Sequence, residues 1–248
     1  MLAAMPGDTL FAMARRARAA AGGVVYHVIN RGNCRTRIFT KAGDFKAFVK
    51  LLREACERVA GMRVLAYCLM DNHWHLVLWP RRDGDLAKFV GWVSNTHVRR
   101  WRQHRRSVGE GHLYQGRYKS FPVQADAHLL AVLRYAEANA VRAKRVRHAR
   151  DWPFGSLAAR LAGGEEARWM ARWPVDRPEP WEAEVDAAQD RQMLDTLRAC
   201  VARGRPFGSE AWVERTVKRL GLEHTVRDPW RPKRKPAKAT LRPREGRP

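Results

Sequence analysis

Residues 63–79 read RVLAYCLMDNHWHLVLW, two apolar runs on either side of an Asp-Asn pair. Arg63 to Met70 and His73 to Trp79 are rich in the β-branched, aromatic and aliphatic residues that favour strands. Asp71-Asn72 is typical of a tight turn between two antiparallel strands. We therefore predict a β-hairpin at this point of the chain.

The sequence around this hairpin alternates between strand and helix patterns. Val24 to Ile29 is rich in β-branched residues and ends at a turn cluster, Asn30 to Asn33. Residues 114–123 form an extended segment, and Asp126 is suited to cap a helix that runs to about residue 139. Apolar residues recur with helical spacing in two further segments, at Phe45, Phe48, Val49, Leu52, Cys56 and Val59, and at Leu86, Phe89, Val90, Val93 and His97.

This order of strand, helix, strand, strand, helix, strand predicts an α+β fold. We expect a ferredoxin-like antiparallel sheet of the split βαβ type with helices on one face, to which the helix at 126–139 is an addition. Helices are also predicted at 186–202 and 209–220. The expected zones are a basic leader over residues 1–22, a main domain over 23–160, a helical C-terminal appendage over 161–225 and a disordered basic tail over 226–248.

The charge balance of the chain is strongly basic. It has 48 Lys and Arg against 25 Asp and Glu, a net charge of +23 over 248 residues. Such an excess favours a polyanionic partner, and nucleic acid is the usual one. The four cysteines form no CxxC pair, which argues against a zinc ribbon and against a disulfide-bonded secreted fold. We find no membrane span or signal peptide in the sequence and expect a cytoplasmic protein.

Two histidines stand in alternate positions of the second hairpin strand. Side chains of a strand alternate between its faces, so His73 and His75 are expected side by side on the same face. Two imidazoles in this arrangement can chelate one divalent metal ion. Two surface histidines beside a turn would give the same pattern, and the pattern alone favours that simpler interpretation.

The helix that starts at Asp126 is suited to complete such a site. Tyr135 and Asn139 are four residues apart and share a helix face. Tyr135 offers a phenol as nucleophile, and Asn139 offers an amide oxygen as a metal ligand. Two imidazoles and an amide leave positions open for phosphate oxygens, as phosphodiester cleavage requires. For Tyr135 the structural alternative is a half-buried aromatic on an amphipathic helix.

Basic and aromatic residues are interleaved over residues 111–120. This composition suits single-stranded nucleic acid, because Arg and Lys contact phosphates while aromatic rings stack on bases. Tyr114 and Tyr118 are also rival nucleophiles on chemistry alone. The alternatives are a strand with a solvated edge and a solvated helix end at 99–106. The candidates for DNA contact are Arg31, Arg99, Arg100, Arg102, Tyr114, Gln115, Arg117, Tyr118 and Lys119.

Four motifs occur in order along the chain. They are YHVINRGN at 26–33, YCLMDNHWHL at 67–76, YQGRYKS at 114–120, and LRY at 133–135 with Asn139 and VRA at 141–143. Together they resemble the single-tyrosine transposases of the HUH nuclease class, most of all the REP-associated tyrosine transposases. The resemblance covers roughly residues 13–160, and four motifs in order are more specific than any one of them.

The resemblance implies a role for each matching residue. His73 and His75 match the paired metal-binding histidines, and Asn139 falls where the family places a polar metal-ligand candidate. Tyr135 matches the nucleophile. The implied cofactor is Mg²⁺ or Mn²⁺. The implied reaction is cleavage of single-stranded DNA near hairpins through a 5′-phosphotyrosine intermediate, followed by rejoining of strands. Family members commonly have Asn-Pro where this chain has Asn139-Ala140, which puts the local helix end in question.

Two other functions are left open by the sequence. A domesticated relative would bind DNA or RNA hairpins without strand transfer, and an unrelated metal hydrolase is disfavoured by the charge. The complete set of His73, His75 and Tyr135 favours the metal-dependent single-stranded DNA endonuclease and transposase. We expect single-stranded or hairpin DNA as the partner, no membrane association, a monomer or homodimer, and a place at the nucleoid. Met1 and Met13 are both candidate translation starts.

Overall fold

The computed structural model describes residues 20–227. All but the first two residues of the expected basic tail, and most of the expected leader, lie outside these residues. Four strands form one antiparallel sheet in the order β2-β3-β1-β4. Their bounds are β1 (Val25–Arg31), β2 (Met62–Met70), β3 (His73–Pro80) and β4 (Lys119–Val123).

The predicted ferredoxin-like fold is confirmed. Helix α1 (Ala42–Arg58) connects β1 to β2, and α2 (Asp85–His104) connects β3 to β4. Only Asp71 and Asn72 separate β2 from β3, so the predicted hairpin is present. None of the helices among residues 20–227 is long and apolar enough to cross a membrane.

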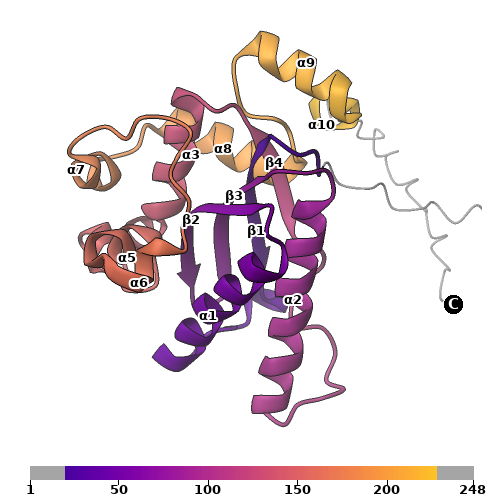
Figure 1. Ribbon diagram of the computed structural model, residues 1–248, viewed down its shortest axis with the longest axis vertical. Coiled ribbons are helices and arrows are strands. Elements are labelled where there is room, and N and C mark those ends of the chain that lie inside the picture. Colours follow the sequence, from indigo (N-terminus) through magenta and orange to yellow (C-terminus); the bar gives the residue numbers. More distant parts are fainter. Residues whose placement is uncertain (1–19, 228–248) are drawn as a thin grey trace, which may run out of the picture.

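One face of the sheet is covered by α1 and α2 (Figure 1). Alternate residues of β3 point into this layer, and Trp74, Leu76 and Leu78 are all fully buried there. They pack against residues on the apolar faces of the two helices, such as Phe48 and Phe89. Burial of these side chains is the main force that holds the helices on the sheet.

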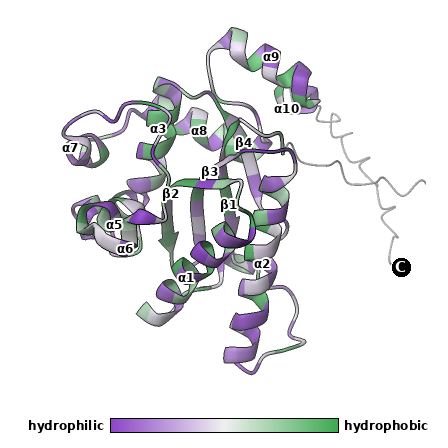
Figure 2. Cartoon of the chain, in the orientation of Figure 1, coloured by the Kyte–Doolittle hydropathy of each residue, from purple (hydrophilic) through white to green (hydrophobic). Residues whose placement is uncertain are grey.

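The opposite face is covered by a second layer that begins with α3 (Ala127–Glu137). The predicted N-cap is present, since the Asp126 carboxylate accepts a hydrogen bond from the backbone N–H of His128. Two later helices, α7 (Trp181–Asp186) and α8 (Arg191–Arg203), pack into this layer. The strands are therefore hydrophobic on both faces, whereas much of the outer surface of the helices is hydrophilic (Figure 2).

Later segments of the chain cover both edges of the sheet. On the β2 edge, the backbone N–H of Leu69 donates to the carbonyl of Phe154, and that of Ala171 donates to Val64. On the β4 edge, Phe207 forms a parallel bridge with Val123. Covered edges cannot pair with another chain. The remaining elements are α4 (Asn139–Arg142), α5 (Ser156–Ala162), α6 (Gly164–Arg168), α9 (Glu210–Leu220), α10 (Glu223–Val226) and the 3-10 turns at Asn33–Arg35 and Ala149–Asp151.

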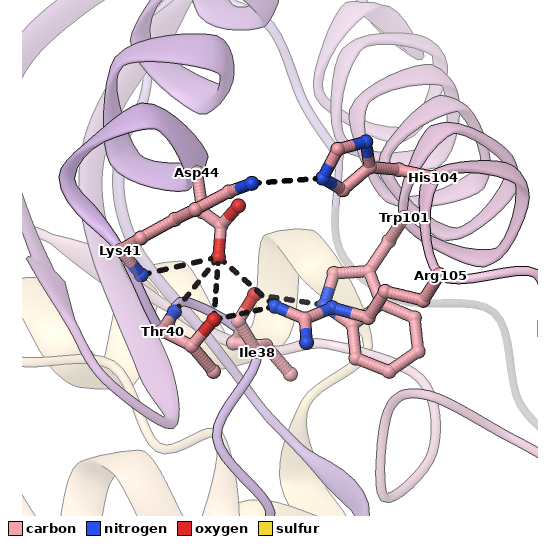
Figure 3. Close-up of polar contacts among 7 residues, drawn as sticks. All are labelled: Ile38, Thr40, Lys41, Asp44, Trp101, His104 and Arg105. Atoms are coloured by element: carbon pink, nitrogen blue, oxygen red, sulfur yellow. Dashed lines mark hydrogen bonds and ion pairs between the residues drawn. The ribbon is translucent and has the colours of Figure 1, made fainter.

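The start of α1 is bound to the end of α2 by a polar cluster (Figure 3). The Asp44 carboxylate accepts hydrogen bonds from the backbone and hydroxyl of Thr40, and the Arg105 guanidinium lies 3.0 Å from it. Burial opposes ionisation of Asp44, but these hydrogen bonds and the positive charge outweigh it and lower its pKa. Nearby, the Trp101 indole donates to the carbonyl of Ile38. Arg105, from the basic run after α2, therefore joins the two helices.

A buried chain of hydrogen bonds lies inside the same layer. The Trp74 indole donates to the Tyr114 hydroxyl over 2.9 Å, and that hydroxyl lies 2.6 Å from His97 Nδ1. A neutral His97 can accept the Tyr114 hydroxyl proton at Nδ1. Burial lowers the pKa of His97 to about 3.

This histidine predicts a loss of stability in acid. The unfolded chain takes up a proton at His97 near pH 6.5, whereas the folded chain excludes it down to about pH 3. His97 therefore contributes stability above pH 6.5 that is lost on acidification, by up to about 1.4 kcal/mol per pH unit. The free energy of unfolding, measured with urea, should fall between pH 6.5 and pH 4.5. The His97→Gln variant should show a smaller slope of this free energy against pH, by the equivalent of up to one proton. An unchanged slope would contradict this assignment.

Candidate active site

Strand β3 presents two imidazoles on the face that α3 covers. Trp74 and Leu76 point into the α1–α2 layer, so His73 and His75 lie on the other face. Their ring centroids are 5.1 Å apart and the rings are nearly perpendicular. The sequence correctly predicts that the two histidines are neighbours.

Helix α3 and the turn after it bring a phenol and an amide to the same place. The ring of Tyr135 lies 5.7 Å from that of His75, edge to face. The amide nitrogen of Asn139 lies 3.0 Å from His73 Nε2 and donates to it. The four residues singled out from the sequence thus meet, although Tyr135 and Asn139 follow the histidines by 60 residues or more and come from two other elements. The helix ends at Glu137, and Asn139 begins α4 even without the proline typical of the family.

Both imidazoles are neutral at physiological pH. Burial, reinforced by the charges of Arg31 and Arg142, lowers the pKa of His73 to about 4. The pKa of His75 is also held well below its usual range, first by burial and then by the neighbouring rings. The Nδ1–H of His73 donates to the Asn72 amide oxygen over 2.7 Å, so the Nε2 lone pair is the one that Asn139 contacts. Neutral imidazoles are the form that binds metals.

The donor set available for a metal is two imidazoles and one amide. Between residues 20 and 227 there is no group of three or more His, Cys, Asp and Glu side chains that could hold a metal ion. His73, His75 and Asn139 fit a divalent cation that completes its coordination with water or phosphate oxygens. The Asn139 amide oxygen accepts from Arg142 over 3.1 Å, so it would have to turn to become a ligand.

Arg142 is the last residue of α4, and its side chain lies over the ring of Tyr135. Its guanidinium lies 4.3 Å from the ring centroid of Tyr135 and donates to the Tyr135 carbonyl over 2.6 Å. It also donates to the side chain of Gln189, in the segment between α7 and α8. The sequence prediction gave Arg142 no role. Its spacing of seven from Tyr135 and three from Asn139, on one helix face, is the signal that could have found it.

The sequence prediction also missed a sixth polar side chain at this site. His27 of β1 is fully buried, and its Nε2 lies 2.8 Å from His75 Nδ1. Its ring centroid lies 5.8 Å from that of Tyr135. It occupies an alternate position of β1, so it faces the same layer as the two histidines of β3. This periodicity could have identified His27 from the sequence.

Residues 21–139 of this sequence match the protein family described as Transposase IS200 like. These residues, just under half of the chain, therefore carry the sequence pattern of this transposase family. No curated protein is significantly similar in sequence.

Among solved structures, this chain is similar to two proteins at low identity. One is a REP-associated tyrosine transposase bound to a REP hairpin, at 18% identity over 71% of this chain and 91% of that chain, with a TM-score of 0.47. The other is a protein from Deinococcus radiodurans R1 assigned as a transposase, at 17% identity over 53% of this chain and 92% of that chain, with a TM-score of 0.36. Both similarities are too low for function to be transferred from these structures.

Some of the DNA-contact candidates lie together beside the histidines. A groove of about 300 Å³ is lined by Arg31, Gln115, Arg117 and Lys119, together with Ile29, Asn30, Gly116 and Val201. Arg31 is paired in register with His73, so this groove begins next to the site. Arg117 and Lys119 are exposed. Tyr118 is half-buried against the α1–α2 layer.

Tyr114 requires a correction. Its side chain is only 6% exposed and belongs to the α1–α2 layer, where the hydroxyl contacts Trp74 and His97. Burial raises its pKa above its usual range. It therefore cannot stack on a DNA base in this structure, and it lies on the far side of the sheet from His75. The extended segment is correspondingly shorter than expected, because β4 begins only at Lys119.

The basic residues of α2 lie in the other layer of the molecule. Arg102 also requires a correction, because its guanidinium donates to Ser107 and to the carbonyls of Glu110 and Gly111, which leaves its side chain 12% exposed. Arg100 pairs with Glu54 at 2.7 Å. Arg99 is exposed. The structure does not bring these three arginines to the histidine pair, because α2 covers the opposite face of the sheet.

Proposed function

We propose that this chain is a metal-dependent single-stranded DNA endonuclease and transposase. It would cleave DNA near hairpins through a 5′-phosphotyrosine intermediate and then rejoin strands. The observation that supports this most directly is the convergence of Tyr135, His75, His73 and Asn139 on one face of the sheet. A nucleophile beside neutral imidazoles is the arrangement that phosphoryl transfer to tyrosine needs.

His73, His75 and Asn139 are the residues that would hold Mg²⁺ or Mn²⁺. Such an ion, when bound, neutralises charge on the scissile phosphate and aligns its oxygens. Arg31 and Arg142 add fixed positive charge on either side, as their effect on the His73 pKa indicates. They are placed to attract and orient the phosphate.

Tyr135 is the proposed nucleophile. Its residue is only 8% exposed, but its hydroxyl forms no hydrogen bond with any residue between 20 and 227, so no internal hydrogen bond has to break before it attacks. The phenol oxygen forms a bond to phosphorus as the bond to the 3′ oxygen breaks, while the phenol loses a proton and the leaving oxygen gains one. One phosphodiester bond replaces another, so a second 3′-hydroxyl can reverse the step without ATP.

The reaction class is tested with labelled single-stranded DNA that carries imperfect palindromes. With Mg²⁺ or Mn²⁺, cleavage should yield one fragment with a free 3′-hydroxyl and another whose 5′ end stays on the protein. EDTA should prevent both. Tight hairpin binding without cleavage, in either metal and on every substrate of a randomised flank library, would instead favour the non-cleaving hairpin binder.

The groove at Arg31, Gln115, Arg117 and Lys119 is the proposed path of the DNA backbone. Each Lys or Arg contact to a phosphate of a single strand contributes about 0.7 to the slope of log affinity against log salt. Replacing Arg117 and Lys119 together with alanine should therefore reduce that slope by about 1.4. The matched control replaces Arg99 and Arg100, two positive charges on α2, with alanine and should leave the slope unchanged. If that variant reduced the slope instead, the path would run over α2.

We retain three further expectations as part of this proposal. Residues 23–160 would form the nuclease domain, and the appendage at 161–225 would assist DNA binding. The protein would act on DNA at the nucleoid in the cytoplasm. It would work as a monomer or a homodimer.

A further inference from the structure

His27 is a fully buried polar side chain in the middle of the sheet. Its neighbours on β1 facing the same layer are Val25 and Ile29, both apolar. The ring packs between that of Phe121, 5.1 Å away, and that of His75, 5.0 Å away. A polar ring at such a position costs stability relative to an apolar one of similar size. Packing alone does not account for an imidazole here.

The polar contact that His27 makes is with His75. One hydrogen bond of 2.8 Å joins His27 Nε2 to His75 Nδ1, so a single proton lies between these two nitrogens. The other ring nitrogen of His27, Nδ1, is buried and has no hydrogen-bond partner among residues 20–227. Among residues 20–227, His75 is therefore the hydrogen-bond partner of the His27 imidazole.

The position of this proton decides whether His75 can bind a metal through Nε2. If Nδ1 of His75 carries the proton and donates it to His27, the Nε2 nitrogen of His75 keeps its lone pair, and the neutral His27 carries its own proton on the unpartnered Nδ1. If His27 donates instead, the neutral His75 must carry its own proton on Nε2 and cannot ligate there. Metal-binding histidines almost always donate their second ring N–H to a neighbouring acceptor.

We propose that His27 is a positioning residue, which accepts the Nδ1–H of His75 and so holds that ring in the orientation and tautomer that bind a divalent metal. This inference rests on the proposed metal site at His73 and His75. His27 contacts no substrate in this scheme, and its effect is transmitted through His75. Its ring also contacts that of Tyr135, so His27 lies next to both the proposed metal ligand His75 and the proposed nucleophile.

The test is Mn²⁺ binding to the purified full chain without DNA, followed by electron paramagnetic resonance. His27→Phe keeps an aromatic ring and removes the acceptor, and His27→Gln keeps an acceptor. His27→Phe should weaken Mn²⁺ binding about 10- to 100-fold, and His27→Gln should restore it to within about threefold of the wild type. In EDTA, the Tm of His27→Phe should equal or exceed that of the wild type, because a buried polar ring is replaced by an apolar one.

Nitrogen NMR of the metal-free protein gives an independent readout. In the wild type, His75 should carry its proton on Nδ1. A proton on Nε2 of His75 would overturn the proposal, as would Mn²⁺ binding by His27→Phe that equals that of the wild type. A lower Tm together with weak binding in both His27 variants would also overturn it, since that is the result of lost packing.

Failure of the metal site itself is distinguishable from failure of the His27 role. If His75→Ala binds Mn²⁺ as the wild type does, the ion does not bind at His75, and both proposals fail. If His75→Ala abolishes binding while His27→Phe does not, only the role of His27 fails.

Discussion

Replacing Tyr135 with phenylalanine should abolish the covalent adduct between protein and DNA and reduce cleavage at least about 10³-fold. The substitution removes only the hydroxyl, which makes no hydrogen bond to any residue from 20 to 227, so the fold and the DNA affinity should be unchanged. The packing of the ring against His75 and Arg142 is retained. The measurement is a denaturing protein gel with labelled DNA.

Tyr118→Phe is the matched control for that experiment. Tyr118 is half-buried against the other layer of the sheet, and its variant should form the adduct at the wild-type rate. An adduct that survives Tyr135→Phe but disappears in Tyr118→Phe would show that the chemistry is right and the nucleophile wrong. Tyr114 is excluded as the replacement because its hydroxyl contacts Trp74 and His97, on the face of the sheet opposite His75.

Replacing His73 with alanine should lower the cleavage rate by about 10²- to 10³-fold while DNA affinity stays within about twofold. The imidazole is neutral in the folded protein because burial lowers its pKa to about 4, so its removal takes no positive charge from the DNA path. Single-turnover cleavage and filter binding on the same substrate separate the two effects.

The control for His73 is His104→Ala. His104 is an exposed histidine at the end of α2 that contacts Lys41, and its loss should leave cleavage unchanged. If His73→Ala lost binding and cleavage in equal proportion, His73 would be a DNA-binding or structural residue instead of a metal ligand.

The local patterns around the hairpin were sufficient to predict the fold. Alternation in β3, helical spacing in α1 and α2, and Asp71-Asn72 between two strands each reflect an interaction within a short segment. The same alternation placed His73 and His75 on one face. Helical spacing then placed Tyr135 near Asn139, and the structure brings both pairs together.

What the sequence could not predict depends on contacts between distant segments. Tyr114 looked like a DNA-stacking residue because its neighbours are basic, yet Trp74 and His97 draw it into the core. Arg102 was a candidate for DNA contact, yet the loop after α2 folds back onto its guanidinium. His27 and Arg142 are single residues whose partners lie on other elements, and their periodicity carried a signal only once the face of the site was known.

Tandem mass spectrometry of the peptide that carries DNA tests the central claim most directly. The wild-type protein is incubated with Mn²⁺ and a single-stranded hairpin substrate, then digested with nuclease and protease. The account predicts a nucleotide joined through its 5′ phosphate to Tyr135 in the peptide that contains Ala138 and Asn139. A nucleotide on any other residue, or cleavage products with no modified peptide, would contradict it.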